Sequence, residues 1–347
     1  LLKVYRYLMK NKNIEVTIFT DKKNKANYRG FRIERINGLD YKTIFEKILF
    51  VLGLPRFYYT DLIKKLKGYD VIESSNPEFY GFAYQSYLAA KKYNSRLIYR
   101  TSQTVEGFYL FRLAKFFIIP FARKAYDYAS FLLFTNPRAE ERCINLGLMK
   151  NKSKSLVIGH ATDTKCFRPI KFRRQKRKIL LSVGGLYKIK GHHLIIKALK
   201  KILGNGHDVE LWIVGEGYYK DKLAELAKQL SLADRVKFLG KKTHAELAKI
   251  YNGSDVFVLA NYQEMTPAAN EAMACGIPVV AMQCGGDRFV IPSDDFGLIA
   301  KKFDVDGMAN KIMLLLGNEF RAKRMGELQG KLIVHNFSIE KAASKIY

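Results

Sequence analysis

The chain alternates short runs of β-branched and aromatic residues with segments of helical period, and the alternation extends over nearly its whole length. Such a pattern is typical of parallel sheets covered by helices on both faces. The alternation restarts after the basic stretch 171–178, whose polarity indicates a connector. With 347 residues the chain also exceeds one ordinary domain of roughly 100 to 200 residues. The sequence therefore predicts an α/β protein with two Rossmann-like, doubly wound parallel sheets.

The two series of elements can be assigned to residues. In the first series the expected strands are 15–19, 31–36, 70–74, 96–101, 131–135 and 156–158, with helices at 80–92 and 138–146. In the second series the expected strands are 179–183, 209–214, 236–239, 256–259 and 278–282, with helices at 192–203, 220–230, 245–252 and 268–274. The expected domains are 1–170 and 171–347, and the N-terminal helix pattern places the first strand of the first domain before Leu1. Because such sheets bind ligands at the carboxyl ends of their strands, we expect a ligand cleft between two facing domains.

Charge and cysteine content narrow the classes of function. The net charge of +28 suits acidic small molecules, anionic membranes or nucleic acid, and it also fits a surface that is rich in lysine throughout. The sequence has no recognisable nucleic-acid-reading motif, so no nucleic-acid partner is expected. The four cysteines are scattered without metal-ligand spacing, which argues against a zinc site or a disulfide framework. With no apolar stretch of about 20 residues and no visible signal peptide, we expect a cytoplasmic protein.

The segment 182–191 (Ser-Val-Gly-Gly-Leu-Tyr-Lys-Ile-Lys-Gly) ends a buried strand and leads into a helix. A glycine turn before a helix start is suited to anions, since free N–H groups and the helix dipole face the ligand. Gly184 and Gly185 would allow a close approach, and Lys190 would add a mobile positive charge. The alternative is a turn in which glycine serves geometry alone. The sequence thus makes this turn a candidate diphosphate site.

The segment 263–280 runs from a strand exit through a short helix to another buried strand. Thr266 and Pro267 suit the opening of the helix. Glu271 then falls one turn into the helix, where a carboxylate can accept two hydrogen bonds from vicinal ribose hydroxyls. A solvated helix glutamate is the alternative for this residue taken alone.

Together the segments 182–191, 214–217 and 263–280 resemble the pattern of glycosyltransferase family 4 on the GT-B fold, and so do 160–169 and Gly285-Gly286. The likeness covers nearly all of residues 155–300. It implies a retaining glycosyltransferase that uses a nucleotide diphosphate sugar of the UDP or GDP type, with no cofactor and no metal ion. The acceptor would be a glycan or a lipid-linked sugar.

The resemblance also implies roles for individual residues. Lys190 and Glu264 are the candidate catalytic groups: Lys190 would neutralise the diphosphate, and Glu264 would contact the donor sugar. Glu271 would hold the ribose. The remaining candidate donor-binding residues are Gly184, Gly185, Gly215, Gln263, Thr266, Pro267 and Ala268.

Three departures from the family pattern leave alternatives open. Gly185 stands where the family usually has arginine, and Lys188 could compensate. The spacing to Glu271 makes the sugar contact ambiguous between Gln263 and Glu264. On the acceptor side the expected histidine is replaced within residues 100–104, where Ser102 or Gln103 could bind a sugar hydroxyl. A non-catalytic nucleotide-sugar-binding protein and a nucleotide-sugar epimerase therefore stay as alternatives.

Two N-terminal stretches, 47–59 and 108–124, mix basic with large apolar residues. Such segments can lie in an anionic bilayer surface, with Phe116, Phe117 and Phe121 as candidate inserting side chains. The alternative is packing inside the N-terminal domain. The sequence therefore also predicts a peripheral protein on the inner face of the cell membrane.

Overall fold

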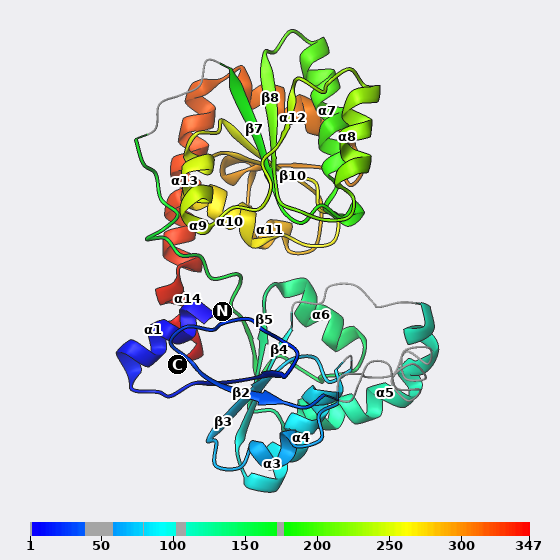
Figure 1. Ribbon diagram of the computed structural model, residues 1–347, viewed down its shortest axis with the longest axis vertical. Helices are drawn as coiled ribbons and strands as arrows, with labels where there is room; N and C mark the ends of the chain where they lie inside the picture. Colours follow the sequence, from blue (N-terminus) through cyan, green and yellow to red (C-terminus); the bar gives the residue numbers. More distant parts are fainter. Residues whose placement is uncertain (1, 39–57, 79, 102–108, 172–176) are drawn as a thin grey trace. The chain divides into compact units, whose positions relative to one another are not determined.

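The computed structural model describes residues 2–38, 58–78, 80–101, 109–171 and 177–347, without the side chains of 109–117. The chain divides into two compact units, Leu2–Gly159 and His160–Ile346 (Figure 1). Both are built from parallel strands and helices, so the predicted α/β class is confirmed. Among the described residues, no helix combines the length and the apolar character that a membrane span requires.

The C-terminal unit contains a six-stranded parallel sheet. Its strands are β7 (Lys178–Val183), β8 (Val209–Val214), β9 (Val236–Phe238), β10 (Val256–Leu259), β11 (Val279–Met282) and β12 (Leu298–Ala300). Their order is β12-β11-β10-β7-β8-β9, so the chain builds outward from β7 in one direction and then returns to build outward in the other. This is the Rossmann strand order, and its direction reverses between β7 and β10.

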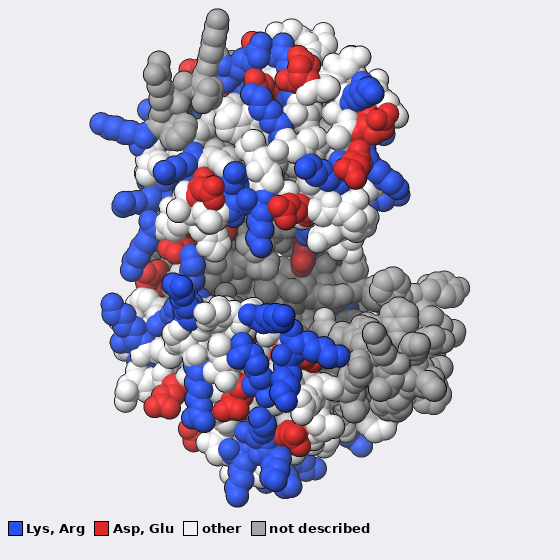
Figure 2. All heavy atoms as spheres, in the orientation of Figure 1, with Lys and Arg blue, Asp and Glu red and all other residues white. Residues whose placement is uncertain are grey.

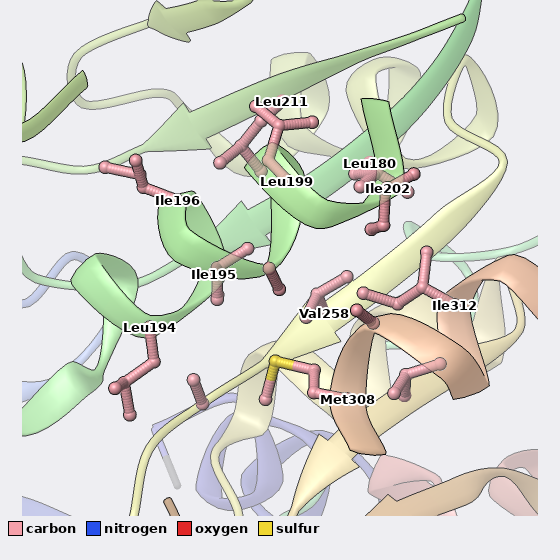
Figure 3. Packing of buried hydrophobic residues seen from close by; sticks show 14 of the residues in the cluster. Leu180, Leu194, Ile195, Ile196, Leu199, Ile202, Leu211, Val258, Met308 and Ile312 are labelled. Carbon is pink, nitrogen blue, oxygen red and sulfur yellow. The ribbon is translucent and has the colours of Figure 1, made fainter. Parts of the chain in front are cut away.

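Helices cover both faces of this sheet. One face carries α7 (His192–Gly204), α8 (Lys220–Gln229) and α12 (Val305–Leu316), and the other carries α9 (His244–Asn252), α10 (Pro267–Ala274) and α13 (Glu319–Phe337). Alternate strand residues serve the two cores: Leu180 and Val258 pack with α7 and α12 (Figure 3), whereas Leu181 and Phe257 pack with α9 and α10. Burial on both faces explains why these strands are continuous apolar runs in the sequence.

The N-terminal unit has a four-stranded parallel sheet in chain order. Its strands are β3 (Val71–Ser74), β4 (Arg96–Thr101), β5 (Phe131–Phe134) and β6 (Ser155–Val157). The helices of this unit are α1 (Leu2–Lys12), α3 (Leu62–Lys65), α4 (Gly81–Tyr93), α5 (Tyr109–Tyr128) and α6 (Pro137–Asn145). The first two strands, β1 (Thr17–Asp21) and β2 (Arg32–Ile36), pair with each other in a separate sheet within the described residues. Their half-exposed, charge-bearing residues bury less apolar surface than β4 or β5 does.

The division between the units falls before residue 160, eleven residues ahead of the expected 170/171 boundary. The intervening segment belongs to the C-terminal unit because it packs there. The Thr162 N–H donates to the Phe337 carbonyl at 2.7 Å, and the Phe167 side chain is buried in the core that contains α9 and α10. The Ile170 N–H donates to Asn252 Oδ1 at 2.8 Å. The segment from His160 to Ile170 thus packs on the C-terminal unit ahead of the basic stretch, of which residues 172–176 lie outside the described residues.

Lys and Arg side chains are spread over the visible face of both units, with Asp and Glu scattered among them (Figure 2). This distribution fits the broad lysine-rich surface that the composition suggested. Net charge alone therefore does not locate a binding site, and the site has to be found from geometry.

Candidate active site

The glycine turn after β7 is held by backbone contacts with the loop after β8. The Gly184 N–H donates to the Val214 carbonyl at 3.0 Å, and the Leu186 N–H donates to the Glu216 carbonyl at 2.9 Å. The two loops approach so closely that a Cβ at Gly215 would overlap the carbonyl oxygen of Gly184. Glycine is needed at this position because any side chain would prevent the two loops from approaching each other. Main-chain groups therefore lie at the ends of these strands.

The turn continues through a short 3-10 helix, Lys188–Lys190, into α7. Gly191, at the junction, has a φ of 72°, a left-handed conformation that favours glycine. A Cβ at this position would overlap the carbonyl oxygen of Ala260, which follows β10. Lys190 and the start of α7 are thereby fixed beside the exit of β10, where the strand order reverses.

The segment Gln263–Met265 is held at the same edge by two sets of contacts. The buried Asn261 donates from its side-chain amide to the Glu264 carbonyl at 2.8 Å. The Gly285 N–H donates to the Gln263 carbonyl at 2.8 Å, and the Met265 N–H donates to the Gly285 carbonyl at 3.0 Å. Burial raises the pKa of the Glu264 carboxyl, and the nearby positive charge of Lys190 opposes the rise. The charge of Lys190 therefore acts on the Glu264 carboxyl, which indicates that the two candidate catalytic residues are neighbours.

Helix α10 starts with Thr266 as the N-cap and Pro267 in the first turn. The Thr266 hydroxyl makes no capping hydrogen bond, and Pro267 has no N–H, so Ala268 offers the backbone donor of this helix start. One turn later, Glu271 accepts a hydrogen bond from the buried Tyr251 hydroxyl at 3.0 Å. The Ala268 carbonyl lies 3.1 Å from the same hydroxyl and shares its single proton with Glu271. Tyr251 therefore orients the predicted ribose-binding carboxylate, a role that sequence spacing did not reveal.

A family model described as "Glycosyl transferases group 1" matches residues 163–331, which contain all of these segments. The match lies within the C-terminal unit, whose sequence is thus similar to that family. The N-acetyl-alpha-D-glucosaminyl L-malate synthase of Bacillus anthracis is 31% identical over 172 residues, which cover 49% of this chain and 44% of that protein. The alignment with this curated relative thus spans less than half of its length.

Solved structures extend the likeness to nearly the whole chain. Sucrose-phosphate synthase from Thermosynechococcus elongatus matches with a TM-score of 0.74 at 21% identity, covering 96% of this chain and 87% of that one. HepE from Anabaena, solved with UDP and glucose, matches with a TM-score of 0.74 at 15% identity, covering 99% and 93%. At these identities the likeness shows the fold, which is the GT-B fold of two Rossmann-like units predicted from the sequence.

Gly185 stands where the resemblance to glycosyltransferase family 4 predicted an arginine, and the space above it is filled by an aromatic ring. A Cβ at Gly185 would lie 2.5 Å from Cε2 of Tyr187. Lys188, which could compensate for the missing cation, is exposed in the following 3-10 helix. At this position the turn therefore has the Tyr187 ring packed on its backbone in place of the flexible charged side chain that was expected.

Beneath the glycine turn lies a buried histidine, His192, the first residue of α7. His192 is only 2% exposed, and its Nδ1 lies 3.2 Å from the Ser182 hydroxyl. Burial lowers its pKa to about 4, so the ring is neutral at physiological pH. Its Nε2 lies next to the Gly184 backbone and makes no hydrogen bond of ordinary geometry. His192 supports the turn as a neutral side chain.

The predicted acceptor-side residues Ser102 and Gln103 lie outside the described residues. Directly before them, at the carboxyl ends of the N-terminal strands, is a buried polar network. Its centre is Glu78, which is 0% exposed and accepts hydrogen bonds from Asn76 at 3.1 Å, Tyr126 at 2.9 Å and Arg142 at 3.1 Å. Asn76 also donates to the Thr101 hydroxyl at the end of β4. This network, which sequence analysis missed, fixes the strand end from which the predicted acceptor residues follow.

A large cavity lies at the opposite edge of the C-terminal sheet. It measures about 940 Å³ and is lined by residues at the starts of β7 and β10 and by α13, including Lys178, Val256 and Gly326. Among the described residues that line it there is no candidate donor-binding residue. Since doubly wound sheets bind ligands at the carboxyl ends of their strands, we place the site at the glycine turn and not in this larger hollow.

Proposed function

We propose that the protein is a glycosyltransferase that moves a sugar from a nucleotide diphosphate sugar to a glycan or lipid-linked acceptor. The observation that carries this proposal is the meeting of the glycine turn and the Gln263–Met265 segment where the strand order reverses, with Lys190 beside Glu264. Two further facts support it. The model of the family described as glycosyl transferases group 1 matches this unit, and HepE, which has the same fold, was solved with UDP and glucose.

In this proposal the diphosphate lies against the Gly184–Gly185 turn and the Ala268 amide, with the Lys190 ammonium neutralising its charge. Glu271, oriented by Tyr251, accepts hydrogen bonds from the ribose diol. Gln263 or Glu264 contacts the donor sugar. Catalysis then rests on stabilising the departing nucleotide diphosphate, because fixed donors and a fixed cation are most effective where charge develops. The lysine and the amides take the role that a metal ion has in other transferases.

We propose further that transfer proceeds with retention of the anomeric configuration, as in glycosyltransferase family 4, with a diphosphate oxygen accepting the acceptor's proton. Incubation with a nucleotide sugar and an acceptor, followed by NMR of the new glycosidic linkage, tests this. Inversion of the anomeric centre would contradict retention. A changed nucleotide sugar without transfer would indicate an epimerase, and donor binding without any product would indicate a non-catalytic protein.

Donor binding has its own test, because a ligand that binds only the folded state raises the unfolding temperature. Trp212 is the sole tryptophan of the sequence and lies in β8, so its fluorescence follows the C-terminal unit. We expect a shift with UDP or GDP, and a roughly tenfold loss of affinity in Lys190→Ala and in Glu271→Ala. Lys228→Ala, an exposed lysine on α8, is the control. Absence of a shift with UDP, GDP and ADP alike would overturn the proposal.

The proposed lipid-linked acceptor requires a membrane-facing surface, for which α4 and α5 offer a candidate. Phe121 is 56% exposed, with the Tyr84 ring at 6.3 Å and the Lys124 ammonium at 5.9 Å. A hollow of about 690 Å³ nearby is lined by Tyr84, Lys124 and further aromatic and basic residues of both helices. Rings flanked by lysines are suited to an anionic bilayer surface. Phe116 and Phe117 lie outside the described side chains.

Sedimentation with phosphatidylglycerol vesicles tests this surface. We expect Phe121→Ala to reduce vesicle binding several-fold, since burying one ring contributes about 1.5 to 3 kcal/mol. Phe320→Ala, which removes a still more exposed ring from α13, should have no effect. Equal losses in both variants, or no binding of the unchanged protein at low salt, would remove the membrane from the proposal.

A further inference from the structure

Five aromatic side chains gather at the carboxyl edge of the C-terminal sheet; Tyr187 lies within the glycine-turn segment 182–191 and Tyr262 directly precedes Gln263, while the other three lie outside the segments assigned to the donor. We call them the aromatic rim: Tyr187, Tyr218, Tyr219, Tyr262 and Phe303. They follow four different strands, β7, β8, β10 and β12. A single exposed ring is ordinary on a protein surface, but rings from four loops at one edge form a continuous feature.

The rings of the rim contact one another in two groups. The centroids of Tyr187 and Tyr218 are 5.4 Å apart, and those of Tyr218 and Tyr219 are 6.3 Å apart. The centroids of Tyr262 and Phe303 are 5.0 Å apart. The pKa of the Tyr262 phenol is raised chiefly by burial and also by Tyr219 and Tyr218, so the two groups are neighbours. Exposure is high at both ends: 76% for Tyr218 and 55% for Phe303.

Lysines accompany these rings. The Lys302 ammonium lies 5.8 Å from the Tyr262 ring and 5.3 Å from the Phe303 ring, and Lys222 lies 5.8 Å from the Tyr219 ring. Lys188 and Lys220 are exposed next to Tyr187 and Tyr219 in the chain. The exposed acidic groups in the same loops are Glu216 and Asp221. Positive charge therefore predominates around the rim.

The backbone at Phe303 is strained. Its φ is 64°, a left-handed conformation that a bulky side chain rarely adopts. The Phe303 N–H donates to the Met282 sulfur at 3.2 Å, a weak acceptor. A stable core does not explain this conformation, because the ring it presents is mostly in solvent. Strain that serves to present an exposed ring indicates a binding role.

The rim adjoins the proposed diphosphate turn through Tyr187, which packs on Gly185, but it lies apart from the proposed ribose contact. Tyr219 packs on the core that contains α7, α8 and α12. Glu271 lies on α10 and its partner Tyr251 on α9, the helices of the opposite face. A nucleoside held by Glu271 therefore leaves the rim free for a different ligand.

We propose that the aromatic rim binds the sugar rings of an anionic glycan, which is the acceptor or the elongated product. Exposed Tyr and Phe faces pack on the apolar C–H faces of pyranoses, while tyrosine hydroxyls can bond to sugar hydroxyls. The lysines would neutralise carboxylate, sulfate or phosphate groups on the glycan. Four of the five rings are tyrosines, whose hydroxyls suit a wet saccharide better than a bilayer interior. The inference deepens the proposed function by naming the chemical class of the acceptor.

The test measures glycan binding without turnover. Hyaluronan, alginate, polygalacturonate and heparin serve as acidic polysaccharides, dextran as a neutral one, and poly-glutamate as a polyanion without sugar rings. In affinity electrophoresis we expect retardation by at least one acidic polysaccharide and weaker effects of dextran and poly-glutamate. Tyr218→Ala and Lys302→Ala should each reduce the retardation at least fivefold, whereas Phe320→Ala should leave it unchanged. No retardation by any acidic polysaccharide, or equal retardation by poly-glutamate, would overturn the inference.

A second variant separates binding from folding. Phe303→Asn replaces the strained ring by a residue that tolerates a positive φ, so it should raise the unfolding temperature reported by Trp212 while it weakens glycan binding. If the rim variants keep full glycan binding, the rim is not the glycan site. The same conclusion follows if they lose vesicle binding alone. The thermal shift with UDP or GDP should persist in all rim variants. If the protein without substitutions shows no thermal shift with UDP or GDP, the proposed function itself is contradicted. The two failures are therefore distinguishable.

Discussion

The carboxyl edges of the two sheets differ in the chemical groups that form them. At the edge of the C-terminal sheet, loops approach through glycines, and backbone groups lie there beside the half-buried Lys190. At the edge of the N-terminal sheet, Glu78 and Arg142 are paired and buried, with Asn76 and Tyr126 completing the network. The first edge is suited to a diphosphate that brings its own charge. At the N-terminal edge the charged side chains pair with each other, which suits a rigid support for a neutral or variable ligand.

The largest effect is expected where the N-terminal edge is broken. Glu78→Leu leaves Arg142 buried without its carboxylate, and removal of one partner of a buried pair costs about 3 to 5 kcal/mol. Hydrogen exchange of the amides of β3, β4 and α6 measures the loss. The double variant Glu78→Leu/Arg142→Leu should recover more than half of it, because no unpaired charge then remains. A single variant that costs under about 1 kcal/mol would mean that this pair does not hold the edge together.

The C-terminal edge should be sensitive to a single methyl group. Gly191→Ala places a Cβ against the Ala260 carbonyl at a φ of 72°, and we expect a loss of about 3 kcal/mol in the free energy of unfolding followed by Trp212. Gly206→Ala is the matched control. Its φ is 84°, but nothing lies within 4 Å, so only the conformational cost of about 1 kcal/mol applies. Similar losses in the two variants would show that close approach at the glycine turn is not what the edge requires.

These two edges also differ in how far sequence could predict them. The bounds of β8 and β10 were predicted correctly, because strands buried on both faces leave unbroken apolar runs. The glycine turn and the Glu264 segment are local in sequence and could be located as motifs. The Glu78–Arg142 pair joins positions 64 residues apart, and no local pattern marks it. The Tyr187 ring over Gly185 likewise depends on a side-chain direction that periodicity does not specify.

The neutral histidine under the glycine turn provides a pH-dependent comparison. Because burial holds the pKa of His192 at about 4, the unfolded chain binds a proton below about pH 6.5 that the folded chain does not. Stability should therefore fall as the pH drops from about 6.5 to 4, by up to about 3 kcal/mol from this group. His192→Gln should flatten this dependence in Trp212 unfolding curves. An unchanged slope between pH 7 and 4 would assign the acid sensitivity to other groups.

The smallest expected effect separates orientation from stability. Tyr251→Phe removes the hydrogen bond that orients Glu271, which contributes about 1 kcal/mol, so the affinity for UDP or GDP should fall about fivefold. The corresponding change at the other edge is Tyr126→Phe, which removes a hydrogen bond to Glu78. That variant should lower the stability of the N-terminal unit by a similar amount and leave nucleotide affinity unchanged. If both variants affected nucleotide affinity equally, the two edges would not be divided between donor binding and structural support, because a hydroxyl at either edge would then be coupled to the same ligand.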